Sequence, residues 1–179
     1  MTPVTMDHHL YPKEPSPEAN WAPRDWPVNL ARTGFRLPTE AEWEIATRAG
    51  SRTAYGFGSA VGLLKHFGWF TENSGKSSHQ SKELRPSTRG VFDLHGNVFE
   101  WVHDWYTEYV LSSQSDPARS KEGLERVNRG GGWLGLAEYC RSANRFADPP
   151  TFRTTFGGFR LAKSLRTETV EPEDKSHIP

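Results

Sequence analysis

The sequence predicts one α+β domain in which several short strands and one or two helices are set in long loops. Its 179 residues are enough to build a single hydrophobic core. The chain has ten Phe, five Tyr and seven Trp but a low mean hydropathy, which is typical of a loop-rich domain held together by aromatic side chains. Its sixteen Gly and thirteen Pro also indicate many turns.

The composition excludes several classes of partner and site. The 22 basic residues balance 22 acidic ones, so we expect neither nucleic acid nor an anionic membrane surface as a partner. A single Cys excludes an intrachain disulfide. No run of 18 apolar residues occurs and no apolar segment follows a basic start, so neither a transmembrane helix nor a signal peptide is expected. These features favour a cytoplasmic protein.

The first 33 residues differ in composition from the rest. Residues 1–33 are polar and rich in proline, and we expect an extended arm that docks through Trp21 and Trp26. The following residues, 34–163, carry the aromatic and glycine-rich segments and form the predicted domain. The charged residues 164–179 are expected to form a frayed tail.

The clearest helix is predicted over residues 37–50. Thr39 is a good N-cap, and Glu42 three residues later completes a capping box. Gly50 is a natural stop just beyond the last turn. For the three acids of this helix, Glu40, Glu42 and Glu44, we expect solvation and a favourable interaction with the helix dipole.

The segment from Val91 to Trp105, VFDLHGNVFEWVHDW, predicts a strand, a turn at Gly96-Asn97 and a second strand. Two acids, Asp93 and Glu100, lie among its apolar residues. An unpaired buried carboxylate is costly, so each of them needs a partner. That partner could be an arginine, a set of backbone N–H groups or a cation such as Ca²⁺, which prefers hard oxygen ligands.

The C-terminal part predicts further strands at Arg126 to Trp133, at Cys140 to Arg145 and at Gly157 to Leu161. It also contains four arginines that need an explanation. They either pair with acids in a polar core or form an anion-binding or peptide-binding groove. The arginines are Arg129, Arg141, Arg145 and Arg160, and the candidate acids are Asp93, Glu100, Asp104 and Asp148.

Three segments together resemble the formylglycine-generating enzyme family, also called sulfatase-modifying factor domains. They are GFRLPTEAEWEIATRAG at 34–50, DLHGNVFEW at 93–101 and RVNRGGGWLGLAEYCRSANRFADPPTFRTTFGGFRLA at 126–162. The resemblance implies an irregular C-type-lectin-like α+β fold with short antiparallel strands. Because family domains usually begin earlier, it also implies that the domain at 34–163 is shortened at its N-terminal side.

The resemblance implies a structural calcium ion at the turn motif. Carried over by position, Asp93 and Glu100 would supply side-chain oxygens, and Gly96 and Val98 would supply backbone carbonyls. Asn73 is the nearest candidate for a second calcium site.

The oxidation of cysteine to formylglycine in this family uses copper held by two cysteine thiolates. Counted from Arg129, Gly135 takes the first cysteine position and Cys140 the second. Counted back from Gly158, Cys140 instead matches a non-catalytic position, and we prefer this register because CRSANR then aligns without strain. In both registers the pair is broken, so copper is not expected and Cys140 is predicted to be a buried structural thiol.

The main hypothesis is therefore a calcium-stabilised binding or accessory module of a bacterial protein, without formylglycine-generating activity. Its protein or peptide ligand would contact Trp133, Tyr139, Arg141 and Arg145, and the resemblance implies association with a protein kinase or a sulfatase. One alternative is an oxidoreductase of the same family that modifies a protein substrate through an unrecognised metal site. Another is a lectin-fold receptor, although Tyr139 and Asn144 are too few exchangeable residues to argue for it.

Overall fold

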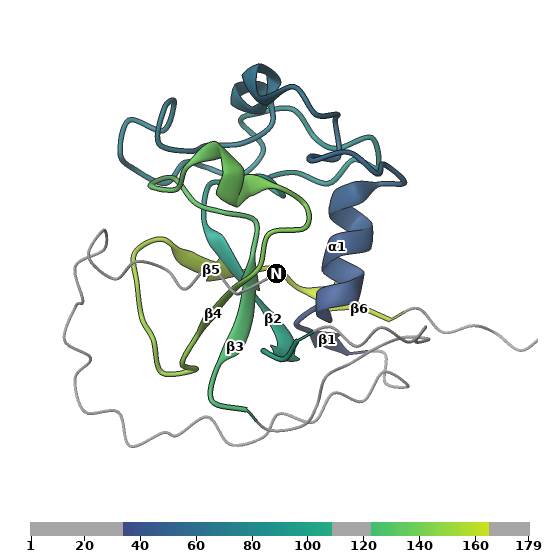
Figure 1. Cartoon of the computed structure of the whole chain (residues 1–179), viewed down its shortest axis with the longest axis vertical. Helices are drawn as coiled ribbons and strands as arrows, with labels where there is room; N and C mark the ends of the chain where they lie inside the picture. Colours follow the sequence, from purple (N-terminus) through teal and green to yellow (C-terminus); the bar gives the residue numbers. More distant parts are fainter. Residues whose placement is uncertain (1–33, 109–122, 165–179) are drawn as a thin grey trace, which may run out of the picture.

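The computed structural model describes residues 34–108 and 123–164 (Figure 1). The predicted arm at 1–33, with Trp21 and Trp26, and all but the first residue of the predicted tail lie outside these ranges. The elements in chain order are β1 (Phe35–Arg36), α1 (Glu40–Arg48), η1 (Val61–His66), β2 (Phe99–Trp105), β3 (Arg126–Arg129), η2 (Ala137–Cys140), β4 (Phe146–Asp148), β5 (Gly157–Phe159) and β6 (Ala162–Lys163). Short strands, one α-helix and long loops confirm the predicted α+β class.

The centre of the fold is a four-stranded sheet in the order β4-β3-β2-β5. β2 pairs antiparallel with β3 and parallel with β5, and β3 pairs antiparallel with β4. β1 and β6 form a separate antiparallel pair that brings the two ends of the described chain together. In Figure 1, α1 stands beside the sheet, and the loops drawn in blue and teal lie above it.

The helix α1 begins as its sequence predicts. The Thr39 hydroxyl accepts a hydrogen bond from the Glu42 N–H at 3.2 Å, and the Glu42 carboxylate accepts one from the Thr39 N–H at 2.8 Å. This reciprocal pair is the capping box, which satisfies two backbone donors at the open end of the helix. The helix ends at Arg48, and the left-handed residues Ala49 and Gly50 reverse the chain.

Three apolar clusters form the interior. The first lies between α1 and the sheet and contains Trp43, Leu94, Val102 and Val127. The second packs on the other side of β2 and contains Phe99, Phe146 and Phe156. The third lies among the loops and contains Tyr55, Leu64, Phe70 and Cys140. Because Phe99 and Val102 occupy different clusters, β2 has the two-sided burial expected of a central strand.

Two predicted strands are not formed. Residues 91–94 do not pair in a sheet, because Asp93, Gly96 and Asn97 have φ angles of 58°, 117° and 68° and turn the chain repeatedly. Gly96 also lies so close to Trp69 that a Cβ there would be 2.3 Å from the Trp69 carbonyl oxygen. In the predicted strand from Cys140 to Arg145, Cys140 instead ends η2, and pairing resumes at Phe146.

None of the helices in the described ranges is both long enough and apolar enough to cross a bilayer.

Candidate functional site

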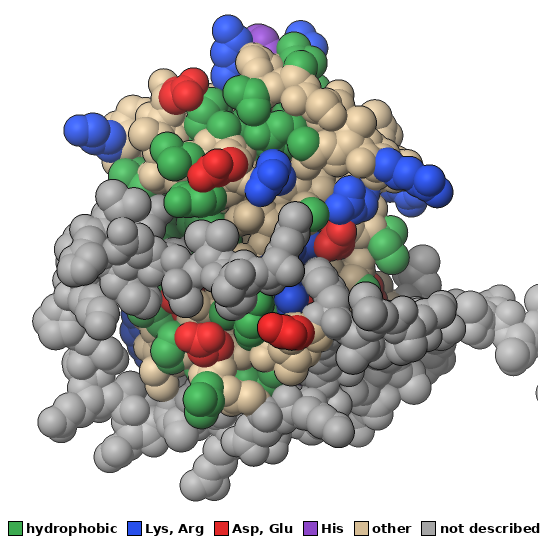
Figure 2. Space-filling model, viewed as in Figure 1, with side chains coloured by type: hydrophobic (Ala, Val, Ile, Leu, Met, Phe, Trp, Pro, Cys, Tyr) green, Lys and Arg blue, Asp and Glu red, His purple; other side chains and the backbone are tan. Residues whose placement is uncertain are grey.

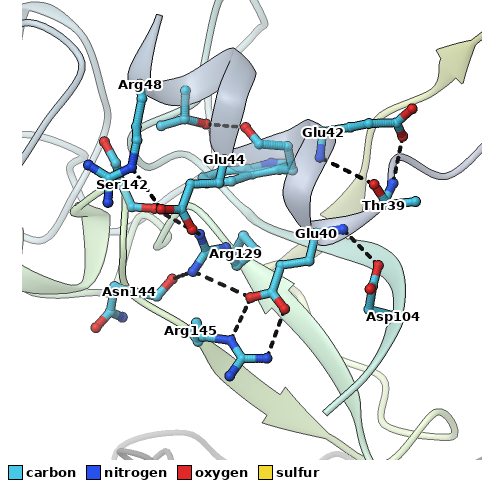
Figure 3. A network of polar contacts seen from close by, with 12 residues as sticks. Thr39, Glu40, Glu42, Glu44, Arg48, Asp104, Arg129, Ser142, Asn144 and Arg145 are labelled. Atoms are coloured by element: carbon cyan, nitrogen blue, oxygen red, sulfur yellow. Dashed lines mark hydrogen bonds and ion pairs between the residues drawn. The ribbon is translucent and has the colours of Figure 1, made fainter. Parts of the chain in front are cut away.

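A network of buried charges joins α1 to the sheet (Figure 3). Glu40 at the first turn is 4% exposed, and its backbone N–H donates to the Asp104 carboxylate of β2 at 2.7 Å. Its own carboxylate accepts two hydrogen bonds from Arg145, at 2.5 and 2.8 Å. Such a bidentate pair fixes both distance and orientation between the helix and the segment that leads into β4.

Arg129 at the end of β3 is the centre of this network. It is fully buried and donates to the Glu44 carboxylate at 2.5 Å and to the Ser142 carbonyl at 2.8 Å. It also bonds the Asn144 carbonyl and lies 5.0 Å from the centre of the Trp43 ring. A buried guanidinium needs this many partners because each unpaired N–H would be costly.

The expectation that Glu40 and Glu44 are solvated acids on the helix surface is therefore wrong. Both carboxylates face arginines of the sheet side, and Arg129 and Arg145 find acidic partners on α1. Glu42, whose side chain is 42% exposed, pairs with Arg36 at 2.6 Å, and that pair lowers the pKa of its carboxyl. The Glu44 side chain is 24% exposed.

Glu100 pairs with Arg160, as one of the expected arginine–acid pairs. Its carboxylate accepts two hydrogen bonds of 2.5 Å from Arg160 and one of 2.6 Å from the Trp43 indole. The same guanidinium reaches the backbone carbonyls of Phe92 and Asp93 at 3.1 and 3.3 Å. The Arg160 guanidinium thus lies between the Glu100 carboxylate and the Phe92 and Asp93 carbonyls.

Asp93 has different partners. Its carboxylate accepts a hydrogen bond of 2.5 Å from the Ser81 hydroxyl and one of 3.1 Å from the Lys82 backbone N–H. A calcium ion held by Asp93, Gly96, Val98 and Glu100 stays a prediction. Asp93 and Gly96 have positive φ angles in the turn, and Glu100 already receives three N–H donors. Asn73, the candidate for a second calcium site, uses its side chain to bond Phe70 and Gly68.

Cys140 is buried, as predicted for a structural thiol. It is 0% exposed, and burial raises the pKa of its thiol to about 12. Its sulfur packs against Gly131, where a Cβ would lie 2.6 Å from Sγ. A thiol with this pKa carries almost no thiolate at neutral pH, so Cys140 is a poor nucleophile.

The predicted ligand-binding residues separate into three environments. Trp133 and Tyr139 are half-buried and pack together against the cluster of Phe99, Phe146 and Phe156. Arg141 is exposed and donates to the Glu138 carbonyl at 3.1 Å. Arg145 belongs instead to the network with Glu40. Of these four residues, Arg141 is exposed, and Trp133 and Tyr139 are partly buried.

His95 is a buried residue that was not among the predicted site residues. Its Nδ1–H donates to the Cys140 carbonyl at 2.8 Å, because a carbonyl can only accept, and its Nε2 accepts from the Gly56 N–H at 3.2 Å. Both ring nitrogens are used by a neutral imidazole. Burial lowers the pKa of His95 to about 4, so it is uncharged at neutral pH.

Comparison with known proteins places the chain in a family. The family described as "Sulfatase-modifying factor enzyme 1-like domain" matches residues 16–165. The formylglycine-generating enzyme of Streptomyces coelicolor is 36% identical over 173 residues, which cover 84% of this chain and 53% of that enzyme. The serine/threonine-protein kinase pkn1 of Chlamydia pneumoniae is 35% identical over 137 residues, which cover 74% of this chain and 21% of that kinase.

Solved structures are similar to this chain in both fold and sequence. Treponema denticola variable protein 1 superposes with a TM-score of 0.73 at 37% identity, over 77% of this chain and 50% of that protein. PvdO from Pseudomonas aeruginosa gives a TM-score of 0.65 at 30% identity, over 73% of this chain and 53% of that protein. The chain thus spans between a fifth and about half of the length of these proteins. It belongs to the sulfatase-modifying factor enzyme 1-like domain family, as a member without the active-site cysteine pair.

Proposed function

We propose that this domain is a binding or accessory module that does not oxidise cysteine to formylglycine by a two-thiolate copper mechanism. The observation that carries the proposal is the environment of Cys140, the one cysteine of the chain. Its thiol is fully buried against Gly131, and its pKa is raised to about 12. A Cu(I) site of the kind that this chemistry uses needs two reachable thiolates, and this segment offers neither.

The position of the glycines supports the same conclusion. Gly135, which takes the first cysteine position in one register, lies so close to Gly132 that a Cβ would meet the Gly132 carbonyl oxygen at 3.1 Å. Gly132 stands where the family pattern has serine, and a Cβ there would meet the Phe99 ring at 3.0 Å. The loop is therefore packed tightly around glycine, and the side chains of a copper site would require it to move.

The ligand of the module is proposed to be a protein or peptide that contacts Trp133, Tyr139 and Arg141. Large aromatic residues and arginine are the side chains that most often anchor protein interfaces. Trp133 and Tyr139 offer half-buried rings that are held by the core, and Arg141 offers an exposed guanidinium beside them in sequence. Arg145 would contribute by holding this segment to α1 rather than by touching the ligand.

Association with a protein kinase is supported by the relatives. In the chlamydial kinases named pkn1, the part that resembles this chain is about a fifth of the protein, so the domain accompanies other sequence there. The resemblance to formylglycine-generating enzymes supports a sulfatase as the other candidate partner. In either case the domain would hold a polypeptide near a separate activity.

A calcium ion at the turn is proposed separately. Asp93 and the carbonyls of Gly96 and Val98 would be its ligands, with water completing the shell. Glu100 would join them only by leaving Arg160, whose guanidinium would keep only its hydrogen bonds to the Phe92 and Asp93 carbonyls. The ion would hold the left-handed turn in place and take no part in chemistry.

The oxidoreductase alternative has no comparable support. Over residues 34–108 and 123–164, no three His, Cys, Asp or Glu side chains gather closely enough to form a metal cluster.

The test of the proposed function has two parts. Purified protein with Cu(I) and O₂ is incubated with a cysteine peptide from a sulfatase, and aldehyde is captured with a hydrazide probe, with a formylglycine-generating enzyme as the positive control. Aldehyde formation above background would overturn the proposal. In parallel, Trp133→Ala and Arg141→Ala should reduce capture of candidate kinase or sulfatase chains, whereas Arg52→Ala, at an exposed position elsewhere, should not.

A further inference from the structure

A cavity in the loop layer forms a candidate site that is separate from the proposed ligand surface. Its volume is about 280 Å³, and it contains none of Trp133, Tyr139 and Arg141. The lining residues come from three segments of the blue and teal loops in Figure 1: Gly56, Phe57, Phe67, Arg85, Pro86, Ser87, Thr88, Val91, Asp93, Leu94 and His95.

The walls of the cavity are apolar and aromatic. Phe57 and Phe67 stack with their centroids 4.3 Å apart, and the edge of His95 meets Phe57 at 5.3 Å. Leu94 is buried beneath them. Because both nitrogens of His95 already have partners, the imidazole offers the cavity an apolar surface rather than a free donor.

The wall formed by residues 85–91 is held in place by its own hydrogen bonds. The Arg85 N–H donates to the His66 carbonyl at 2.9 Å, and the Ser87 N–H donates to the Val91 carbonyl at 2.8 Å. The Ser87 hydroxyl accepts from the Val91 N–H at 3.2 Å, which closes the turn. The cavity is thus formed before any ligand arrives, which lowers the entropic cost of binding.

One charged side chain at the mouth of the cavity, that of Arg85, is available to a ligand. Arg85 is exposed, and within the described ranges its guanidinium has no hydrogen-bond or ion-pair partner. Asp93 also lines the cavity, but its carboxylate is held by Ser81 and Lys82. The donors to Asp93 are neutral, so its carboxylate keeps its charge but is engaged within the loop. The guanidinium of Arg85 is available to a ligand, and it favours a carboxylate.

We propose that this cavity receives one aromatic side chain of a polypeptide partner, with an adjacent acidic residue paired to Arg85. A cavity of about 280 Å³ lies just below the usual range for small-molecule sites but accommodates a phenyl or phenol group. A peptide can insert such a ring and leave its backbone outside the mouth. Aromatic groups in preformed pockets are typical anchors of protein interfaces.

The test titrates ¹⁵N-labelled full-length protein with a capped tetrapeptide of glycine, phenylalanine, glutamate and glycine. Amide shifts should concentrate at Phe57, Thr88 and Leu94, with an affinity of about millimolar strength because one ring is buried. Matched peptides replace the phenylalanine by alanine, which should abolish the shifts, or the glutamate by lysine, which should weaken binding.

Two variants and a control complete the test. Arg85→Glu should weaken binding of the glutamate peptide by about twofold to fivefold, as expected when one surface ion pair is lost. It should strengthen binding of the lysine peptide. Thr88→Trp should fill the cavity and abolish binding, whereas Arg89→Trp places the same ring on the neighbouring exposed residue and should not. Unchanged melting temperatures would show that these exposed substitutions preserve the fold.

Several results would overturn the proposal. They are shifts that avoid the cavity, equal binding of the alanine peptide, and unchanged binding by Thr88→Trp. If 3-phenylpropionate alone bound as tightly as the peptide, the site would belong to small aromatic acids and the polypeptide assignment would be wrong. Because the readout does not involve Trp133 or Arg141, failure here would leave the proposed function untouched.

Discussion

Arg145 holds Glu40 through two hydrogen bonds of 2.5 and 2.8 Å, although the two residues lie 105 positions apart in the chain. The pair connects the first turn of α1 to the segment leading into β4, and Arg129 contacts the same carboxylate at 3.7 Å. One buried acid thus faces two arginines, with Glu44 as the second acid of the network. Glu44 also accepts a hydrogen bond of 2.7 Å from Arg48, and its side chain is 24% exposed.

Removal of the Glu40 charge should strongly destabilise the protein. Glu40→Gln would remove the negative charge from a buried pair with Arg145 that Arg129 also contacts, and we expect the free energy of unfolding to fall by about 3–5 kcal/mol. Urea denaturation monitored by tryptophan fluorescence would measure this loss. Glu83→Gln, which removes an acid whose side chain is 44% exposed beside His79, should change stability by less than about 0.5 kcal/mol. Equal effects of the two substitutions would contradict the role assigned to the network.

Acidification should destabilise the protein through His95. Its pKa is about 4 in the folded state and near 6.5 in an unfolded chain, so the unfolded state binds the proton first as pH falls. The stability that the neutral imidazole contributes is therefore complete above pH ~6.5 and is lost progressively as pH falls towards ~4, by about 3 kcal/mol in total. The physical reason is burial, which disfavours the charged form of the ring. A protonated Nε2 would also point an N–H at the Gly56 N–H.

Unfolding free energies at several pH values between these limits would measure the effect of His95. His95→Gln should flatten the dependence on pH, whereas His79→Gln, which changes a half-buried histidine stacked on Trp69, should retain it. If the free energy of unfolding of His95→Gln fell with pH as steeply as that of the unmodified protein, groups other than His95 would cause the loss of stability in acid.

The pair of Glu100 and Arg160 should stabilise the protein with or without calcium. Arg160→Met would leave the Glu100 carboxylate buried with the Trp43 indole as its remaining donor, and we expect a loss of about 3 kcal/mol. Thermal melts in EDTA and in calcium chloride would show whether an ion contributes. We expect calcium to raise the melting temperature of the unmodified protein, Asp93→Asn to abolish that rise, and Arg160→Met to keep it.

If added calcium instead restored the full stability of Arg160→Met, the ion would be taking the place of the guanidinium at Glu100. That outcome would reinstate Glu100 as a calcium ligand and would show that the arginine and the ion compete for one carboxylate.

Local signals in the sequence predicted much of the fold but little of the network. The start of α1 follows from Thr39 and Glu42, which are three residues apart and carry their own capping geometry. The strand after residue 98 follows from its alternation of apolar side chains. In contrast, Glu44 meets Arg129 across 85 positions, and no local pattern distinguishes a helix acid that faces solvent from one that faces a distant strand.

The turn before β2 shows why half of a predicted hairpin was wrong. Val91 and Leu94 are apolar, as in a strand, but they pack against the cluster of Trp43, Val102 and Val127 from a loop rather than from a sheet. The deciding feature is backbone conformation at Asp93, where φ is 58°, and a single sequence does not reveal that an aspartate adopts it. The cavity is equally invisible in the sequence, because its walls come from segments that are joined only by folding.

Substitution of Gly131 should reveal how closely Cys140 is packed. Gly131 has a φ of 75°, and a Cβ there would lie 2.6 Å from the Cys140 sulfur and 3.0 Å from its backbone nitrogen. Gly131→Ala should therefore lower the free energy of unfolding by more than about 2 kcal/mol, since conformational strain and overpacking add together. The matched control is Gly75→Ala, where φ is 62° but open space surrounds the Cβ, so the cost should be about 1 kcal/mol.

The double variant Gly131→Ala/Cys140→Ala separates the two contributions. Removal of the sulfur takes away the shortest contact but leaves the close backbone atoms. Gly131→Ala should therefore lower the free energy of unfolding less when Cys140→Ala is already present than in the unmodified protein. Native-state alkylation of Cys140 gives an independent measure, because a buried thiol with a raised pKa should react with iodoacetamide only when the protein opens. Labelling as fast as that of a free thiol in the folded protein would contradict both the packing of Cys140 and its proposed inert role.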